Sequence, residues 1–230
     1  MGLYGKINCM NIFRADSISI KVNDNYILED LSFSITEKEI TLLFSYYDEA
    51  QAVLNALYLK NKVLKGKLYY GNEDLTSFNF NNREEWRISD IGYISYRDRL
   101  FENLTVFDNI TMPVRLNRLT VQEEYIDELL DNLNLEDIKN EYVKDISLVD
   151  RVKVLLARAM AARPFVLLLN DITKGLKQFE IDIIVDCLSH LNNLYHTSII
   201  HATNYQLLKS SASRVLTIQD GVIKDDKDSV

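Results

Sequence analysis

The spacing of hydrophobic positions changes along the chain, and each spacing predicts a different kind of element. Residues 17–36 alternate apolar with polar, which predicts two strands, Ser17–Val22 and Ile27–Ile35, around a polar turn. Val166–Leu169 has no polar alternation, as expected for a strand that is covered on both faces of a parallel sheet. Apolar runs bounded by turn residues predict further short strands at Ile40–Leu43, Gly66–Gly71, Ile91–Ser95, Ser198–His201 and Val215–Ile218.

Apolar residues with the helical period occupy three longer segments. They predict helices at about Val121–Leu133, Ser147–Ala162 and Phe179–Leu194. Phe78–Glu85 is polar and rich in Asn, which is typical of a surface connection. Strands that alternate with helices predict an α/β fold, and no repeat or long linker divides the chain.

Length and composition are those of a single globular domain. With 230 residues, 47% of them hydrophobic, we expect one domain over residues 1–230, with a helical lobe inserted at about 97–150. The net charge of −8 argues against nucleic acid as a partner, because phosphate backbones are bound by basic surfaces. The sequence contains no apolar run long enough for a membrane span and no signal-peptide core, so we expect a cytoplasmic location.

The residue types that bind metals form no cluster. Cys9 and Cys187 are isolated from each other, which argues against a disulfide and against a metal site. The histidines also lack the spacing of a metal site or a catalytic triad, at positions His190, His196 and His201.

Ile40–Leu57 has the outline of a phosphate-binding loop without its chemistry. An apolar strand enters a turn, and a helix with one buried face follows. A working loop reads G-x-x-x-x-G-K-[ST]: backbone N–H groups surround the phosphates, Lys reaches the terminal phosphates, and the hydroxyl holds Mg²⁺. The glycine, glycine, lysine and hydroxyl positions are occupied here, in that order, by Phe44, Glu49, Ala50 and Gln51, and Ala52 follows.

Two further features of this turn disfavour an anion. Asp48 and Glu49 place carboxylates where phosphates would lie. The whole chain contains 7 glycines, about half the average usage, so few backbone positions can wrap closely around phosphates. We therefore expect this loop to repel ATP.

Three later segments carry a recognisable pattern. They are Leu104–Pro113 (LTVFDNITMP), Val154–Pro164 (VLLARAMAARP) before a strand, and Arg214–Ile223 near the end. In order and spacing, the chain resembles the ATP-binding subunit of an ABC transporter over roughly residues 17–224. Leu104–Pro113 is similar to the branch that serves lipoprotein release, macrolide export and cell division. The resemblance implies a P-loop NTPase-like ABC ATPase fold with a mixed or parallel sheet core, an antiparallel β subdomain and a helical subdomain.

The positions that carry this family's chemistry depart from its pattern. The glutamine-loop position is Tyr96, the Walker B Asp and the catalytic Glu are replaced by Asn170 and Asp171, and the switch His is replaced by Asn204. The family implies ATP and Mg²⁺ as cofactors, but phosphoryl transfer depends on positioning and charge, so these losses predict no binding or weak binding. The signature Leu-Ser-Gly-Gly-Gln is replaced by Ile146, Ser147, Leu148, Val149 and Asp150, in which only the serine is kept.

The resemblance also implies partners. Members of the family dock on an integral-membrane permease at the inner face of the membrane and pair with a second ATP-binding subunit, so a homodimer and a second ABC subunit are both open. Leu100, Phe101 and Phe107 are candidates for the docking surface, with a core role in the helical lobe as the alternative. In the family, each ATP site of a dimer combines the phosphate-binding loop of one subunit with the signature of the other. Loss of both motifs would therefore damage both sites of a dimer.

Three functions fit these observations. The first is a pseudo-ATPase subunit that docks on a permease as a scaffold or regulator. The second is a weak or asymmetric ATPase that works with a competent partner, and the third is a soluble regulator that binds another protein.

Overall fold

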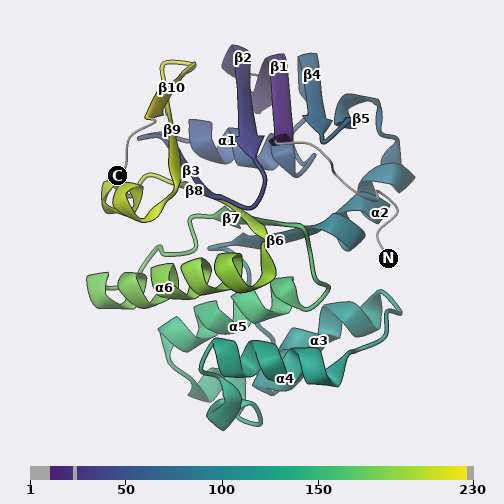
Figure 1. The fold of residues 1–230 in the computed structure, drawn as a ribbon, viewed down its shortest axis with the longest axis vertical. Coiled ribbons are helices and arrows are strands. Elements are labelled where there is room, and N and C mark those ends of the chain that lie inside the picture. The colour runs from purple at the N-terminus through teal and green to yellow at the C-terminus, as the bar shows by residue number, and fades with distance from the viewer. Residues whose placement is uncertain (1–10, 23–24, 227–230) are drawn as a thin grey trace.

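A computed structural model of the chain describes residues 11–22 and 25–226. It contains two β-sheets, one helix between them, and a layer of helices on the other side of the larger sheet (Figure 1). Cys9, the turn residues Asn23 and Asp24, and the tail beyond Asp226 lie outside the described residues.

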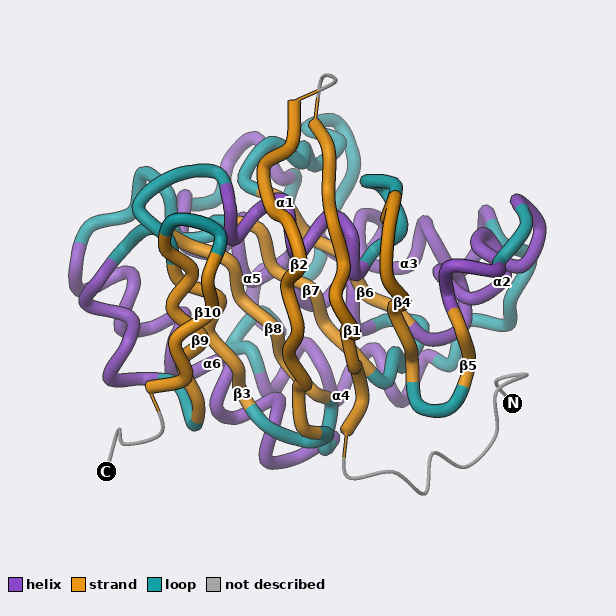
Figure 2. The backbone as a smooth tube through the Cα atoms, turned by 90° about the horizontal axis from the view of Figure 1, so that it is seen from above, coloured by secondary structure: helices purple, strands orange, loops and turns teal. Residues whose placement is uncertain are grey.

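The smaller sheet is antiparallel, and Figure 2 shows its strands lying over those of the larger one. β1 is longer than predicted because the register shifts between Ala15 and Ile18, where Ser17 has a φ of 50°, and this bulge interrupts the alternation. Gly66 (φ +75°) is required opposite, since a Cβ there would lie 2.2 Å from the Ser17 carbonyl oxygen. The strand order is β2–β1–β4–β5, formed by β2 (Asn25–Thr36), β1 (Asn11–Val22), β4 (Val63–Tyr70) and β5 (Glu73–Asp74).

The larger sheet is mixed and matches the predicted strand positions. β7 lies between β6 and β8, all three are parallel, and every residue of β7 is buried, which confirms the prediction from its unbroken apolar run. β10 pairs antiparallel with β9, so the predicted tail is a strand as far as Asp226. The order is β10 (Val222–Asp226), β9 (Arg214–Gln219), β3 (Ile40–Phe44), β8 (Ser198–Thr203), β7 (Val166–Asn170) and β6 (Ile91–Ser95).

The three longer predicted helices and the helix predicted within Ile40–Leu57 are confirmed, and the structure adds two more, α2 and α3. The segment 97–150 carries α3 and α4, and α5 returns the chain to β7. Short 3₁₀ turns occupy residues 75–77, 136–138, 143–145 and 206–211. The helices are α1 (Glu49–Leu57), α2 (Phe80–Asp90), α3 (Val106–Leu116), α4 (Glu123–Asn132), α5 (Leu148–Met160) and α6 (Gln178–Tyr195).

The interpretation of Phe78–Glu85 as a surface connection is wrong. The Asn79 side chain accepts a hydrogen bond from Asn82 N at 3.0 Å and begins α2 at Phe80. Trp86 on this helix is fully buried and stacks edge-on against Phe13 and Tyr70 of the antiparallel sheet. One large aromatic residue therefore anchors a helix that is otherwise mostly polar, and such a helix shows little apolar period.

The two faces of the larger sheet bury different cores. Val166, Leu168 and Ile200 face α1 and the antiparallel sheet, whereas Leu167 and Leu169 face the helical layer of α3 to α6. The carboxyl ends of the parallel strands consequently open between the two cores, where ligands commonly bind in α/β folds.

Candidate functional site

A cleft of about 490 Å³ lies at the carboxyl ends of β3, β6, β7 and β8. Its lining includes residues from loops that are far apart in the sequence. Six of the positions predicted to be equivalent to nucleotide-site residues meet there: Gln51, Ala52, Tyr96, Asn170, Asp171 and Asn204. The other three lie beside the cleft: Phe44 and Ala50 are fully buried, and Glu49 is partly exposed.

The loop after β3 is closed by one of its own side chains. Ser45 Oγ accepts hydrogen bonds from Tyr47 N at 3.2 Å and from Ala50 N at 3.4 Å, and donates to the Tyr47 carbonyl at 2.5 Å. Backbone N–H groups at the start of a helix are the donors that a phosphate-binding loop offers to its ligand. Ala50 N at the helix start and Tyr47 N in the preceding loop are therefore already used inside the chain.

The first turn of α1 carries negative charge. Asp48 precedes the helix and Glu49 is its first residue, where the helix dipole favours anions. Glu49 Oε1 accepts a hydrogen bond from Gly221 N at 3.1 Å, which connects this helix end to the turn between β9 and β10. Carboxylates of the protein thus supply the negative charge that the start of this helix favours.

The residues at the end of β7 and just after it are held in an internal network. Asn170 Nδ2 donates to the Tyr93 hydroxyl at 3.2 Å, and that hydroxyl donates to Asn55 Oδ1 at 3.1 Å. Asp171 Oδ1 accepts from Thr203 Oγ1 at 3.2 Å, and Asp171 has a left-handed φ of 53°. Asn170 is neutral, so the carboxylate that would hold Mg²⁺ in a working site is replaced by an amide.

Tyr96 lies between two cationic side chains, an arrangement that the sequence analysis missed. Lys174 Nζ lies 4.4 Å from the centroid of the Tyr96 ring, and the Arg97 guanidinium lies 5.3 Å from it. Arg97 Nε also donates to the Tyr96 hydroxyl at 2.9 Å. Only the Arg97–Tyr96 adjacency is visible in the sequence, since Lys174 approaches from the loop after β7. No group of three or more His, Cys, Asp or Glu residues among residues 11–22 and 25–226 has the arrangement of a metal site.

Comparison with known proteins gives the relationship. A family profile described as ABC transporter matches residues 52–174, which is more than half of the chain. The chain belongs to the ABC transporter family. A relative, the methionine import ATP-binding protein MetN of Cupriavidus pinatubonensis, is 29% identical over 203 residues, covering 86% of this chain and 59% of that protein. The chain thus spans about three-fifths of the length of the curated relative it matches.

Solved structures of ABC cassettes have the same fold. MJ0796 bound to ADP and Pi superposes with a TM-score of 0.78 at 20% identity, covering 94% of this chain and 98% of that chain. CbiO1 of Clostridium perfringens superposes with a TM-score of 0.83 at 17% identity, covering 94% and 88%. The predicted ABC ATPase fold is therefore confirmed. The closer branch expected from Leu104–Pro113 stays a prediction.

The signature segment of this ABC family member starts a helix. Ser147 begins α5, and its Oγ accepts from Asp150 N at 3.2 Å and donates to Asp150 Oδ2 at 2.6 Å. Leu148 is half exposed, and Ile146 and Val149 pack against the helical core. The one serine kept from the family pattern has a capping role in this chain.

The residues predicted for docking differ in their exposure. Phe101 is 53% exposed, whereas Leu100 and Phe107 pack against the core of the helical layer. Leu100 also lines a cavity of about 140 Å³ between the Tyr96 loop and α5. Phe101 is thus the member of the trio that is open to a partner.

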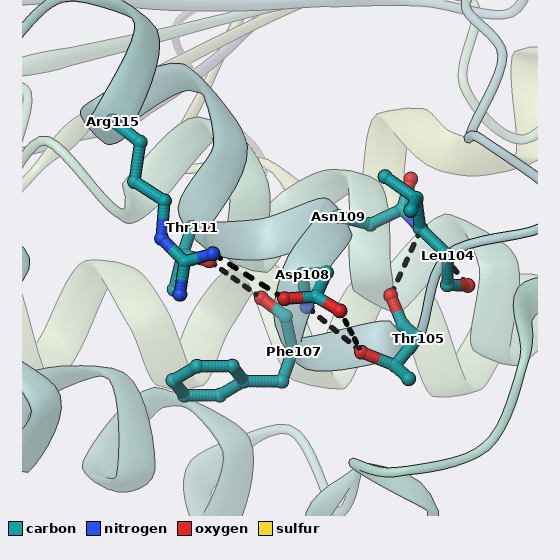
Figure 3. Close-up of polar contacts among 7 residues, drawn as sticks. All are labelled: Leu104, Thr105, Phe107, Asp108, Asn109, Thr111 and Arg115. Carbon is teal, nitrogen blue, oxygen red and sulfur yellow. Dashed lines mark hydrogen bonds and ion pairs between the residues drawn. The ribbon is translucent and has the colours of Figure 1, made fainter.

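Figure 3 shows the polar contacts at the start of α3, which follows the segment that carries Phe101. Thr105 Oγ1 accepts from Asp108 N at 3.1 Å and donates to Asp108 Oδ2 at 2.9 Å, and Arg115 pairs with Asp108 at 3.4 Å. The side chain of Asn109 is completely buried, with Oδ1 accepting from Phe101 N at 2.8 Å and Nδ2 donating to the Phe101 and Thr105 carbonyls.

A larger apolar groove of about 510 Å³ was not predicted. It lies between α2, the loop after α3 and the end of α5. Its exposed apolar residues are Ile88, Leu119 and Phe165, which come from three separate parts of the sequence. No helix in the described part of the chain is long and apolar enough to cross a membrane.

Proposed function

We propose that this chain is a pseudo-ATPase subunit of an ABC transporter. It docks on an integral-membrane permease at the inner face of the membrane and acts as a scaffold or regulator, without hydrolysing ATP. The observation that carries the proposal is the loop after β3, whose Tyr47 and Ala50 N–H groups bond to Ser45 Oγ and whose lysine position holds a buried alanine, Ala50.

The electrostatics of the cleft support this assignment. Mg-ATP brings phosphates that need a lysine, a hydroxyl ligand for the metal and a Walker B carboxylate. In this chain those positions hold Ala50, Gln51 and Asn170, and Asp48 and Glu49 add negative charge at the helix start. Loss of a single preorganised contact of this kind costs about 3–4 kcal/mol in typical enzymes. Several such losses together disfavour turnover.

The apolar groove supports a protein partner. Exposed apolar side chains that line one groove usually mark an interaction site. Leu119 is 46% exposed and Phe165 52% exposed, and Leu116 (75% exposed) lies at the end of the adjacent helix α3. We assign this groove, together with Phe101, to the permease. The proposal also includes a second subunit, which is either another copy of this chain or a different ABC subunit.

Leu119→Asp should abolish recovery of a permease when the tagged chain is purified from detergent-solubilised membranes. A carboxylate in an apolar interface is left without a partner when the permease covers it, which costs several kcal/mol and so lowers affinity at least about a hundredfold. The matched control is Leu194→Asp on α6, because Leu194 is also an exposed leucine (45%) and lies outside the groove. Equal recovery with both variants would contradict the assigned surface, and recovery of no permease by the unaltered chain would favour a soluble regulator.

A weak or asymmetric ATPase is the second candidate, and one observation favours it. Lys174, Arg97 and Lys60 line the cleft and bring cationic groups that can approach a phosphate. Two of them are held on the Tyr96 ring, however, and the same cleft contains Asp48 and Asp171. We therefore rank this candidate second.

A further inference from the structure

Another cavity, of about 300 Å³, lies at the amino ends of β7 and β8, and the cleft lies at their carboxyl ends. Its residues come from α4, from the segment between α5 and β7, and from the end of α6. The segments before β7 and β8 line this cavity, whereas the cleft residues Asn170 and Asn204 lie at the end of β7 and just after β8, and the two strands are parallel. Arg163 and Phe165 also line the neighbouring groove that is assigned to the permease, whereas Tyr125, Glu128 and Tyr195 line this cavity alone.

The cavity has an aromatic wall that is held in place by hydrogen bonds. The rings of Tyr125 and Tyr195 lie edge to face, with centroids 5.6 Å apart. Tyr125 Oη donates to the Met160 carbonyl at 3.0 Å, and Asn132 Nδ2 donates to Tyr195 Oη at 3.2 Å. Phe165, 52% exposed, also lines the cavity. Tyr125 is 5% exposed, so Tyr195 and Phe165 are the rings of this wall that offer faces and edges to another ring.

Arg163 supplies a cation at the edge of this wall. Its guanidinium carbon lies 4.1 Å from the centroid of the Tyr125 ring. A guanidinium stacked on a ring keeps its in-plane N–H donors available for a carboxylate, which it can bind through two parallel hydrogen bonds. Arg163 adopts a left-handed backbone conformation (φ 55°), which is uncommon for a residue with a side chain.

Glu128 supplies the opposite charge. Its Oε1 accepts a hydrogen bond from Tyr195 Oη at 3.0 Å, which leaves Oε2 for another donor. Burial and this bond together raise the pKa of Tyr195 to about 12, so the tyrosine stays a donor at neutral pH. The eight ion pairs of the described residues include neither Arg163 nor Glu128. Two opposite charges therefore flank one aromatic pair without neutralising each other.

We propose that this cavity binds a free aromatic α-amino acid. The carboxylate of the ligand pairs with Arg163, its ammonium group with Glu128, and its ring packs against Tyr195 and Phe165. A zwitterion satisfies both unpaired charges at once, which an anion or a cation alone does not. The volume of about 300 Å³ is at the lower end of the range of ligand pockets, which suits a single amino acid rather than a peptide.

Isothermal titration of the full chain with free phenylalanine, tyrosine and tryptophan tests the proposal. We expect saturable binding with a Kd of about 0.1 mM, which corresponds to a binding free energy of about 5.5 kcal/mol. N-acetylphenylalanine and phenylalanine methyl ester each lack one of the two charges and should bind at least about tenfold more weakly. Glycine, which keeps both charges and lacks the ring, should bind more weakly than phenylalanine by a similar factor.

Two variants assign the contacts. Arg163→Met keeps an apolar stem, and Glu128→Gln keeps an oxygen acceptor for Tyr195, so each removes a charge with little change of packing. Each should weaken phenylalanine binding at least about tenfold. The matched controls are Arg118→Met, an exposed arginine that also has a left-handed φ (56°), and Glu124→Gln, one turn earlier on α4.

Thermal melting without ligand separates a binding effect from a folding effect. Arg163 and Glu128 are both exposed, so the variants should melt within a few degrees of the unaltered chain. Absence of saturable binding by all three aromatic amino acids up to about 10 mM would overturn the proposal. Binding that is unchanged by both variants would overturn it as well.

Discussion

Replacement of Asp90 by Asn should raise the free energy of unfolding at pH 7 by up to about 3 kcal/mol. Asp90 is 1% exposed, and neither of its carboxylate oxygens has a hydrogen-bond partner among the described residues. Burial raises the pKa of this carboxyl from 3.8 to about 6. Each pKa unit of such a rise corresponds to about 1.4 kcal/mol of lost stability once the group is ionised. An amide keeps the shape of the side chain and removes the cost of a buried charge.

The sign of the pH dependence follows from proton binding. Between pH 3.8 and about 6 the folded chain binds more protons at Asp90 than the unfolded chain does. The contribution of Asp90 to stability is therefore fully present below pH 3.8, falls as the pH rises to about 6, and stays constant above that. Urea unfolding at pH 7 and at pH 4 measures this contribution. The difference in the free energy of unfolding between Asp90→Asn and the unaltered chain should nearly vanish at pH 4.

Asp137→Asn is the matched control for this experiment. Asp137 is exposed on a short turn, so its replacement should change the free energy of unfolding by less than about 0.5 kcal/mol at either pH. A gain of the same size for both variants would show that net charge, and not the buried carboxylate, is responsible. A less stable Asp90→Asn variant at pH 7 would contradict the prediction outright.

Asn109→Ala should lower the free energy of unfolding by about 3 kcal/mol. The buried side chain holds Phe101 N, the Phe101 carbonyl and the Thr105 carbonyl at 2.8, 3.1 and 2.9 Å. Its removal leaves a small cavity and unpaired backbone groups, each of which costs about 1–3 kcal/mol when it stays buried. A melting temperature lower by about 6–12 °C is expected for a chain of this size.

The same variant also tests the docking surface. Because Asn109 fixes the segment that presents Phe101, the variant should recover less permease from solubilised membranes even at temperatures where it is folded. Asn103→Ala is the control, since Asn103 is exposed in the same segment. Loss of stability without loss of permease recovery would separate Phe101 from the docking surface.

The sequence predicted those elements in which the burial of side chains follows a regular pattern along the chain. β7 is buried on both faces, and its run of apolar residues is visible without any knowledge of its neighbours. α4 and α6 each bury one stripe, which produces a clear helical period. α2 escaped prediction because its packing depends chiefly on Trp86, and a single residue has no period.

The site was only partly accessible from the sequence. The register of the loop after β3 identified the replaced positions, since that motif is local and has a fixed spacing. The role of Ser45 depends on how the turn folds back on itself, and the approach of Lys174 to Tyr96 joins residues that are distant in the chain. The groove around Leu119 could not be predicted for the same reason, because it forms only when α2 and the end of α5 come together in the folded chain.

The central claim is that this cleft does not hold Mg-ATP, and calorimetric titration of the purified chain tests it most directly. We predict no saturable heat with ATP up to about 1 mM, with or without Mg²⁺, because the motif positions for lysine, hydroxyl and carboxylate hold Ala50, Gln51 and Asn170. Magnesium-dependent binding at micromolar concentration, lost in Asp171→Asn, would contradict the account and establish this chain as a nucleotide-binding subunit.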